Sequence, residues 1–188
     1  MTIRDVVPGL WLWQVEYPDW RPREDWGPEV ACTCVESRGE VLLLDPLAPP
    51  DEHALWERLD AKPPTAVVVL KPDHVRDVDR IVERYGCRAF GPFLFFRHDV
   101  PRTELDPIQP GDELPGGLVA LHDGRGRQET PVWLPEQRAL VFADALTAPE
   151  GELRVWATPW HEQRALPALR ALLELPFERA LERPPWDG

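Results

Sequence analysis

The sequence is poor in lysine, in cysteine and in long apolar runs, and each shortage excludes a class of protein. Lysine supplies only 2 of the 21 basic residues, and 33 acidic residues bring the net charge to −12. Nucleic acids and anionic membranes require a basic surface, so we expect neither as a partner. No stretch approaches the roughly 20 apolar residues of a transmembrane helix. The first residues lack the apolar core of a signal peptide, which predicts a cytoplasmic protein.

The three cysteines do not predict disulfides or a metal site. Cys32, Cys34 and Cys87 are an odd number, which suits reduced thiols. Cys32 and Cys34 are two residues apart, so on a strand they share one face, where we interpret them as small buried side chains. A Cys-x-Cys metal half-site would need a second half, which the sequence does not offer.

The pattern of apolar residues predicts one α/β domain that spans residues 1–188, a length sufficient for a sizeable core. Predicted strands cover Leu10–Glu16, Val30–Glu36, Glu40–Leu44, Val67–Leu70, Leu118–Leu121, Pro131–Leu134, Ala139–Phe142 and Arg179–Leu181. Predicted helices cover Asp51–Leu59, Val75–Tyr85 and His161–Leu175. Strands and helices alternate in both halves of the chain, which favours layers of helices packed on sheets.

Residues 67–79 carry the clearest motif: an apolar strand, a short loop with His74 and Asp77, and an amphipathic helix. Each of the two residues also has an ordinary interpretation. His74 could cap the helix that begins beside it, and Asp77 in the first turn favours the helix dipole. Considered alone, the pair could equally be a weak set of metal ligands.

This stretch resembles the first metal-binding loop of the metallo-β-lactamase-like hydrolases, in which a strand is followed by Thr-His-x-His-x-Asp-His. The corresponding positions here hold Lys71 for Thr, Pro72 for the first His, His74 for the second, Arg76 for Asp and Asp77 for the last His. The passages Gly111-Asp112-Glu113-Leu114 and Ala143-Asp144-Ala145-Leu146 resemble later parts of the same family. The resemblance implies a four-layer αββα sandwich with its site where these loops meet.

The same resemblance implies that most metal ligands are missing. Asp144 matches the bridging aspartate and His74 one histidine, but Arg125 stands at another histidine position, and the C-terminal residues contain no histidine. Zinc sites use about three protein ligands per ion. We therefore expect a metal-free protein without a cofactor, in which Arg125 pairs with Asp144 and replaces metal charge.

The predicted remnant pocket contains His74, Arg76, Asp77, His122, Arg125 and Asp144. The preferred hypothesis is a non-catalytic domain that binds a small molecule or a protein partner there. An alternative is a hydrolase with a rebuilt mononuclear zinc or iron site of His74, Asp77, His122 and Asp144. A third is a structural subunit that forms homo-oligomers through a Trp-rich surface. Trp20 and Trp26, on the loop between two early strands, could instead cover the pocket.

Overall fold

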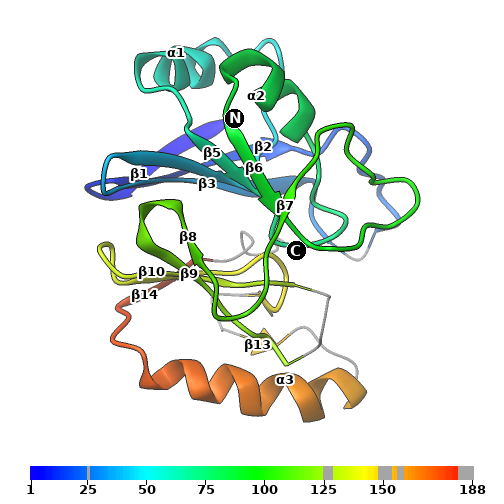
Figure 1. The fold of residues 1–188 in the computed structure, drawn as a ribbon. Helices are drawn as coiled ribbons and strands as arrows, with labels where there is room; N and C mark the ends of the chain where they lie inside the picture. The colour runs from blue at the N-terminus through cyan, green and yellow to red at the C-terminus, as the bar shows by residue number, and fades with distance from the viewer. Residues whose placement is uncertain (25, 125–128, 148–153, 156–158, 182–188) are drawn as a thin grey trace.

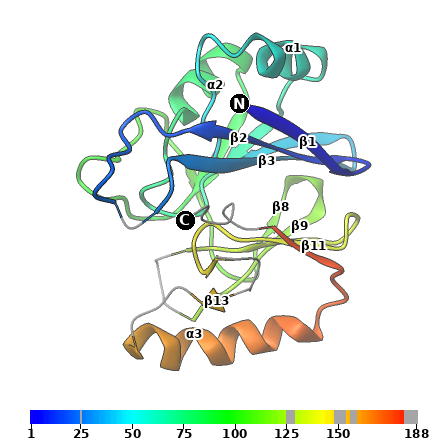
Figure 2. The same ribbon diagram turned by 180° about the vertical axis from the view of Figure 1, so that it is seen from behind.

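The computed structural model describes residues 1–188 except 25, 125–128, 148–153, 156–158 and 182–188. Four layers lie one above the other in Figure 1, and Figure 2 shows the same order from behind. Two helices, α1 (His53–Ala61) and α2 (Val78–Tyr85), cover the outer face of one sheet. Helix α3 (Pro159–Ala171) covers the outer face of the second sheet. The predicted αββα sandwich is thus confirmed.

The first sheet changes from antiparallel to parallel pairing at β4. In their order across the sheet its described strands are β1 (Thr2–Val7), β2 (Leu10–Glu16), β3 (Glu29–Ser37), β4 (Glu40–Leu44), β5 (Ala66–Val68), β6 (Arg88–Gly91) and β7 (Asp106–Pro107). Because β4 and β5 run parallel, the loops that leave their carboxyl ends emerge at the same edge. These two loops carry most of the site described below.

The second sheet is smaller and mostly antiparallel. Its described strands, in spatial order, are β14 (Arg179–Leu181), β11 (Ala139–Val141), β10 (Val132–Leu134), β9 (Leu118–Ala120) and β8 (Glu113–Leu114). Short 3₁₀ turns are η1 (Pro115–Gly117) and η3 (Leu172–Glu174), and a separate ribbon pairs β12 (Leu146–Thr147) with β13 (Arg154–Val155). Thr130 N–H donates to Leu70 C=O at 2.8 Å and joins the two sheets beside the site.

Three apolar cores separate the four layers. The first lies between α1, α2 and the first sheet and includes Trp13, Leu55 and Ile81. The second lies between the sheets, and the third lies between the second sheet and the C-terminal helical segment. The central strands β4 and β5 of the first sheet are apolar on both faces because each face packs on another layer, as expected for sheet interiors.

Two helices begin later than the sequence predicts. Helix α1 begins at His53 rather than at Asp51, and Glu52 stands at the N-cap position without a side-chain hydrogen bond. Helix α2 begins at Val78 rather than at Val75. The three residues before it form a turn in which Arg76 has a φ of 46°, a left-handed conformation that cannot belong to a helix.

Candidate functional site

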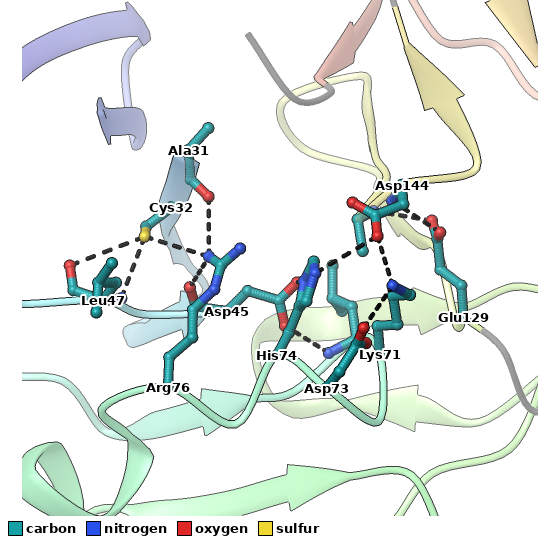
Figure 3. A network of polar contacts seen from close by, with 12 residues as sticks. Ala31, Cys32, Asp45, Leu47, Lys71, Asp73, His74, Arg76, Glu129 and Asp144 are labelled. Carbon is teal, nitrogen blue, oxygen red and sulfur yellow. Dashed lines mark hydrogen bonds and ion pairs between the residues drawn. The ribbon is translucent and has the colours of Figure 1, made fainter. Parts of the chain in front are cut away.

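The loops after β4, β5 and β11 bring Asp45, residues 71–76 and Asp144 together between the two sheets (Figure 3). Each of these strands is buried, so the polar side chains that follow them lie against an apolar core. Asp45 and Asp144 are each 5% exposed. Buried carboxylates must be paired or hydrogen-bonded, and the described residues provide the partners.

His74 lies between these two carboxylates. Its Nδ1 is 2.7 Å from Asp45 Oδ2, and its Nε2 is 3.6 Å from Asp144 Oδ2. Burial and the nearby Arg76 guanidinium act to lower the pKa of His74, but the two carboxylates outweigh them and raise it to about 9. The imidazole is therefore protonated at neutral pH and carries a positive charge into the site.

Lys71 brings a second positive charge to Asp144. Its Nζ is 2.6 Å from Asp144 Oδ2 and 2.8 Å from Asp73 Oδ2. Burial favours a lower pKa for the Lys71 ammonium, but the two carboxylates outweigh it and raise the pKa. Burial likewise favours a higher pKa for Asp144, but His74 and Lys71 hold it well below its usual range. The result is a compact ionised cluster of Lys71, His74 and Asp144.

Arg76 fixes the loop on the other side of His74. One terminal nitrogen, Nη1, donates to the backbone oxygens of Asp45 at 2.7 Å and Ala31 at 3.2 Å. Asp45 also has a positive φ of 48°, so two non-glycine residues of the site hold left-handed backbone conformations. Such conformations are unfavourable and persist where surrounding contacts enforce them, often at functional sites. The Arg76 bonds link both strained positions.

Glu129 supports the loop that presents Asp144. Its carboxylate accepts hydrogen bonds from the backbone N–H groups of Ala143, Asp144 and Ala145 at 2.8, 2.8 and 2.7 Å. The side chain is nearly fully buried. Three charge-assisted bonds from successive amides fix the backbone of this loop, and with it the direction of the Asp144 side chain.

A pocket of about 220 Å³ opens in front of the cluster. It is lined by Tyr17, Trp26, Val30, Lys71, Asp73, His74, Arg76, Asp99 and Asp144. The loop between β2 and β3 and the loop after β6 lie side by side at this end of the molecule in both Figure 1 and Figure 2. A second cavity of about 30 Å³, with room for water, lies deeper beneath His74. A pocket therefore remains between the loops that carry the charged cluster.

The structure brings together only part of the predicted site. His74, Arg76 and Asp144 line the pocket. Asp77 turns away from it, because its carboxylate accepts from Ala48 N–H at 2.8 Å. His122 is exposed to solvent and does not line the pocket. Arg125 lies outside the described residues, so its predicted pairing with Asp144 remains a prediction.

Several site residues, among them Asp45 and Lys71, were missed by the sequence analysis. Asp45 directly follows the buried strand β4, and a lone carboxylate in such a position is a usable signal for a site. Lys71 was noted only as a substitution at the Thr position. A lysine at the end of an apolar strand needs a buried counter-ion, and this reasoning could have linked Lys71 to Asp144.

The described residues do not fit a metal ion. No three His, Cys, Asp or Glu side chains within them are grouped so that they could hold one, and this includes the alternative set of His74, Asp77, His122 and Asp144. The ammonium of Lys71 contacts Asp144 Oδ2 and would compete with a metal ion for that oxygen. Both ring nitrogens of His74 face carboxylates rather than an open coordination position.

Tryptophans do not form an exposed surface in the part of the chain whose side chains are described. Six of them are buried or half-buried: Trp11, Trp13, Trp20, Trp26, Trp56 and Trp133. Trp26 lines the pocket with Tyr17, and Trp20 Nε1 donates to the Trp26 backbone oxygen at 2.6 Å. The exposed large apolar side chains among the described residues are instead Met1, Phe93, Leu94, Phe96, Val100 and Leu173.

Comparison with known proteins identifies the fold. No protein-family model and no curated protein sequence matches this chain. The metallo-β-lactamase FIM-1 from Pseudomonas aeruginosa, in its mono-zinc form, matches with a TM-score of 0.70 and 18% identity over 97% of this chain and 86% of its own. A metallo-β-lactamase from Hirschia baltica matches with a TM-score of 0.68 and 15% identity over 98% and 90%. TTHA1623 in a di-iron-bound form matches with a TM-score of 0.65 and 21% identity over 85% and 89%. No helix in the described part of the chain is both long and apolar enough to cross a membrane. The architecture, the position of the site and these matches together show that this chain has the metallo-β-lactamase fold.

Proposed function

We propose that this protein is a non-catalytic, metal-free domain of the metallo-β-lactamase fold that binds a small ligand through the pocket in front of Lys71, His74 and Asp144. The observation that carries the proposal is the 2.6 Å contact between Lys71 Nζ and Asp144 Oδ2. An ammonium at this distance supplies the positive charge that a buried carboxylate requires. A metal ion could bind Asp144 Oδ2 only after Lys71 had been displaced.

The protonation states in the site argue against hydrolysis by the side chains themselves. A general base must be unprotonated at the working pH, but the pKa of His74 is raised to about 9. A nucleophilic lysine must be neutral, but Asp144 and Asp73 outweigh burial and raise the pKa of Lys71. Burial raises the pKa of the neighbouring Cys32 thiol to about 11, which excludes a thiolate nucleophile.

A small ligand is a better match to the pocket than a macromolecule. Its volume of about 220 Å³ lies below the range of about 300–1,000 Å³ that is usual for drug-sized ligands. A protein partner would instead engage exposed apolar groups such as Phe93 and Phe96, on the loop after β6. Self-association through that loop would appear as a concentration-dependent mass in light scattering.

The test is thermal melting of the purified protein in the presence of excess zinc and, separately, of EDTA. A protein whose folding does not depend on metal keeps the same melting temperature in both conditions. The variant Lys71→Ala, which removes the ammonium from Asp144, serves as the comparison. A rise of many degrees with zinc or a fall with EDTA in the unmodified protein would contradict the proposal.

A further inference from the structure

The pocket wall contains charges that the inner cluster does not neutralise. Lys71 and His74, which line the pocket, are already paired with the carboxylates of Asp144 and Asp45. Arg76 and Asp99 also line the pocket, and neither forms an ion pair with a described residue. Among the described residues that line the pocket, Arg76 and Asp99 thus remain without an ion-pair partner.

The free part of Arg76 is one edge of its guanidinium. Every hydrogen bond of this side chain to described residues uses Nη1. Figure 3 shows the other terminal nitrogen on the side of the guanidinium that faces away from Leu47. Nε and the second terminal nitrogen form the planar edge that binds a carboxylate with two parallel hydrogen bonds. The backbone bonds of Nη1 hold that edge in place before a ligand arrives.

The negative side of the pocket is formed by Asp99 and Asp73. Asp99 is half-buried, and its carboxylate has no hydrogen-bond or ion-pair partner among the described residues, while its backbone N–H donates to Phe96 C=O at 2.9 Å. Asp73 Oδ2 binds Lys71, but Asp73 Oδ1 is buried without a hydrogen-bond partner in the described structure. Native proteins rarely leave such an acceptor unpaired. The terminal torsion of aspartate is soft, so a small rotation would turn this oxygen toward a donor in the pocket.

Tyr17 and Trp26 form an aromatic wall of the same pocket. Their ring centroids are 5.6 Å apart and the ring planes are inclined by 59°. Val30 adds an aliphatic surface beside them. This wall suits an apolar or aromatic group of the ligand, and aromatic faces also attract an ammonium group.

We propose that the ligand is a small zwitterion of the amino-acid type with an apolar ring, whose carboxylate binds Arg76 and whose ammonium group binds Asp99 and Asp73. The ring would pack on Tyr17 and Trp26. This inference rests on the proposed function, because it requires a pocket whose inner charges are supplied by side chains rather than by metal. Neither a simple anion nor a simple cation would satisfy both free charges.

Isothermal titration calorimetry with three probes of similar shape tests the proposal. L-phenylalanine carries both charges, 3-phenylpropionate only the carboxylate, and 2-phenylethylamine only the ammonium group. We expect L-phenylalanine to bind at least about tenfold more tightly than either single-charge probe, since each lacks one charge-assisted hydrogen bond. Equal affinity of the three probes, or no binding of L-phenylalanine, would overturn the inference.

Two variants separate the roles of the charges. Asp99→Asn should weaken L-phenylalanine binding about tenfold and leave 3-phenylpropionate binding unweakened. Arg76→Lys retains the charge but removes the planar edge, so it should weaken both carboxylate probes and spare 2-phenylethylamine. Asp51→Asn, an exposed carboxylate outside the pocket, is the matched control and should change nothing. Loss of 3-phenylpropionate binding in Asp99→Asn would contradict the assignment.

The outcomes also separate this inference from the proposed function. If zinc and EDTA leave the melting temperature unchanged but the three probes do not discriminate, the metal-free assignment stands and the zwitterion is wrong. Stoichiometric metal in the purified protein would overturn both. Arg76 also holds backbone groups, so a melting curve of Arg76→Lys must show a folded protein; Asp99→Asn tests the proposal independently of that result.

Discussion

The Lys71–Asp144 ion pair should contribute strongly to stability, and the chain provides its own control. Lys71 and Asp144 have side chains that are 17% and 7% exposed, and the joining N–O distance is 2.6 Å. The pair Lys62–Glu36 has the same distance of 2.6 Å, but its side chains are 59% and 28% exposed. The two pairs therefore share one contact distance but differ in burial and in the additional charged partners, Asp73 and His74, of the buried pair.

The expected size of the effect follows from the geometry. At 2.6 Å the attraction between unit charges is about 6 kcal/mol for an effective dielectric constant of about 20. Removal of both ions from water offsets much of this attraction. Loss of one partner leaves the other charge buried, so Lys71→Met should lower the free energy of unfolding by about 3 kcal/mol. Lys62→Met should lower it by about 0.5 kcal/mol or less.

A double-mutant cycle measures the coupling directly. Urea unfolding of Lys71→Met, Asp144→Asn and the double variant gives the free energy that depends on both side chains together. The same cycle with Lys62→Met and Glu36→Gln gives the exposed reference. We expect a coupling of about 2 kcal/mol for the buried pair and close to zero for the exposed pair.

A coupling free energy for Lys71–Asp144 that is no larger than the one for Lys62–Glu36 would refute the reasoning. It would mean that Asp144 is neutral in the folded protein or that another group supplies its counter-charge. It would also remove the main observation behind the proposed function.

Two further predictions concern the groups around this pair. The pKa of His74 is about 9 in the folded protein against 6.5 for a free histidine. Protonation of His74 therefore adds about 3 kcal/mol to the free energy of unfolding below about pH 6.5, and this stabilisation is lost as the pH rises through 9. Urea unfolding between these pH values should show that loss, and His74→Gln should abolish the slope, whereas the exposed His53→Gln should retain it. Glu129→Gln should lower the free energy of unfolding by about 2 kcal/mol, because an amide N–H would face backbone N–H donors. Exposed Glu104→Gln is the control, and an equal effect in both variants would contradict the role of Glu129.

The sequence predicts the strongly apolar elements well and the polar ones poorly. The bounds of β2, β4 and β14 agree with the prediction, and β2 and β4 do so because each is largely apolar and ends at or before a polar residue. Strand β1 was not predicted, since it is an edge strand with charged residues such as Arg4 and Asp5 exposed to solvent. Strand β6 was not predicted either, because its four residues are too few to show a clear alternation of apolar and polar side chains.

The site could be located from the sequence, but its contacts could not. The resemblance placed His74 and Asp144, which lie at the ends of apolar strands. The direction of Lys71 and the left-handed backbone of Arg76 depend on tertiary contacts with Asp144, Asp45 and Ala31. No local pattern records contacts between residues so distant in sequence. For the same reason, Asp77 was expected in the pocket although it binds a backbone amide outside it.

The most direct test of the central claim is elemental analysis of the protein purified without chelator. Because Lys71 and His74 supply the positive charge beside Asp144, we expect zinc, iron and manganese each far below one ion per chain. One or two bound ions per chain, retained through dialysis, would contradict the account and show that the side chains of this site rearrange around metal.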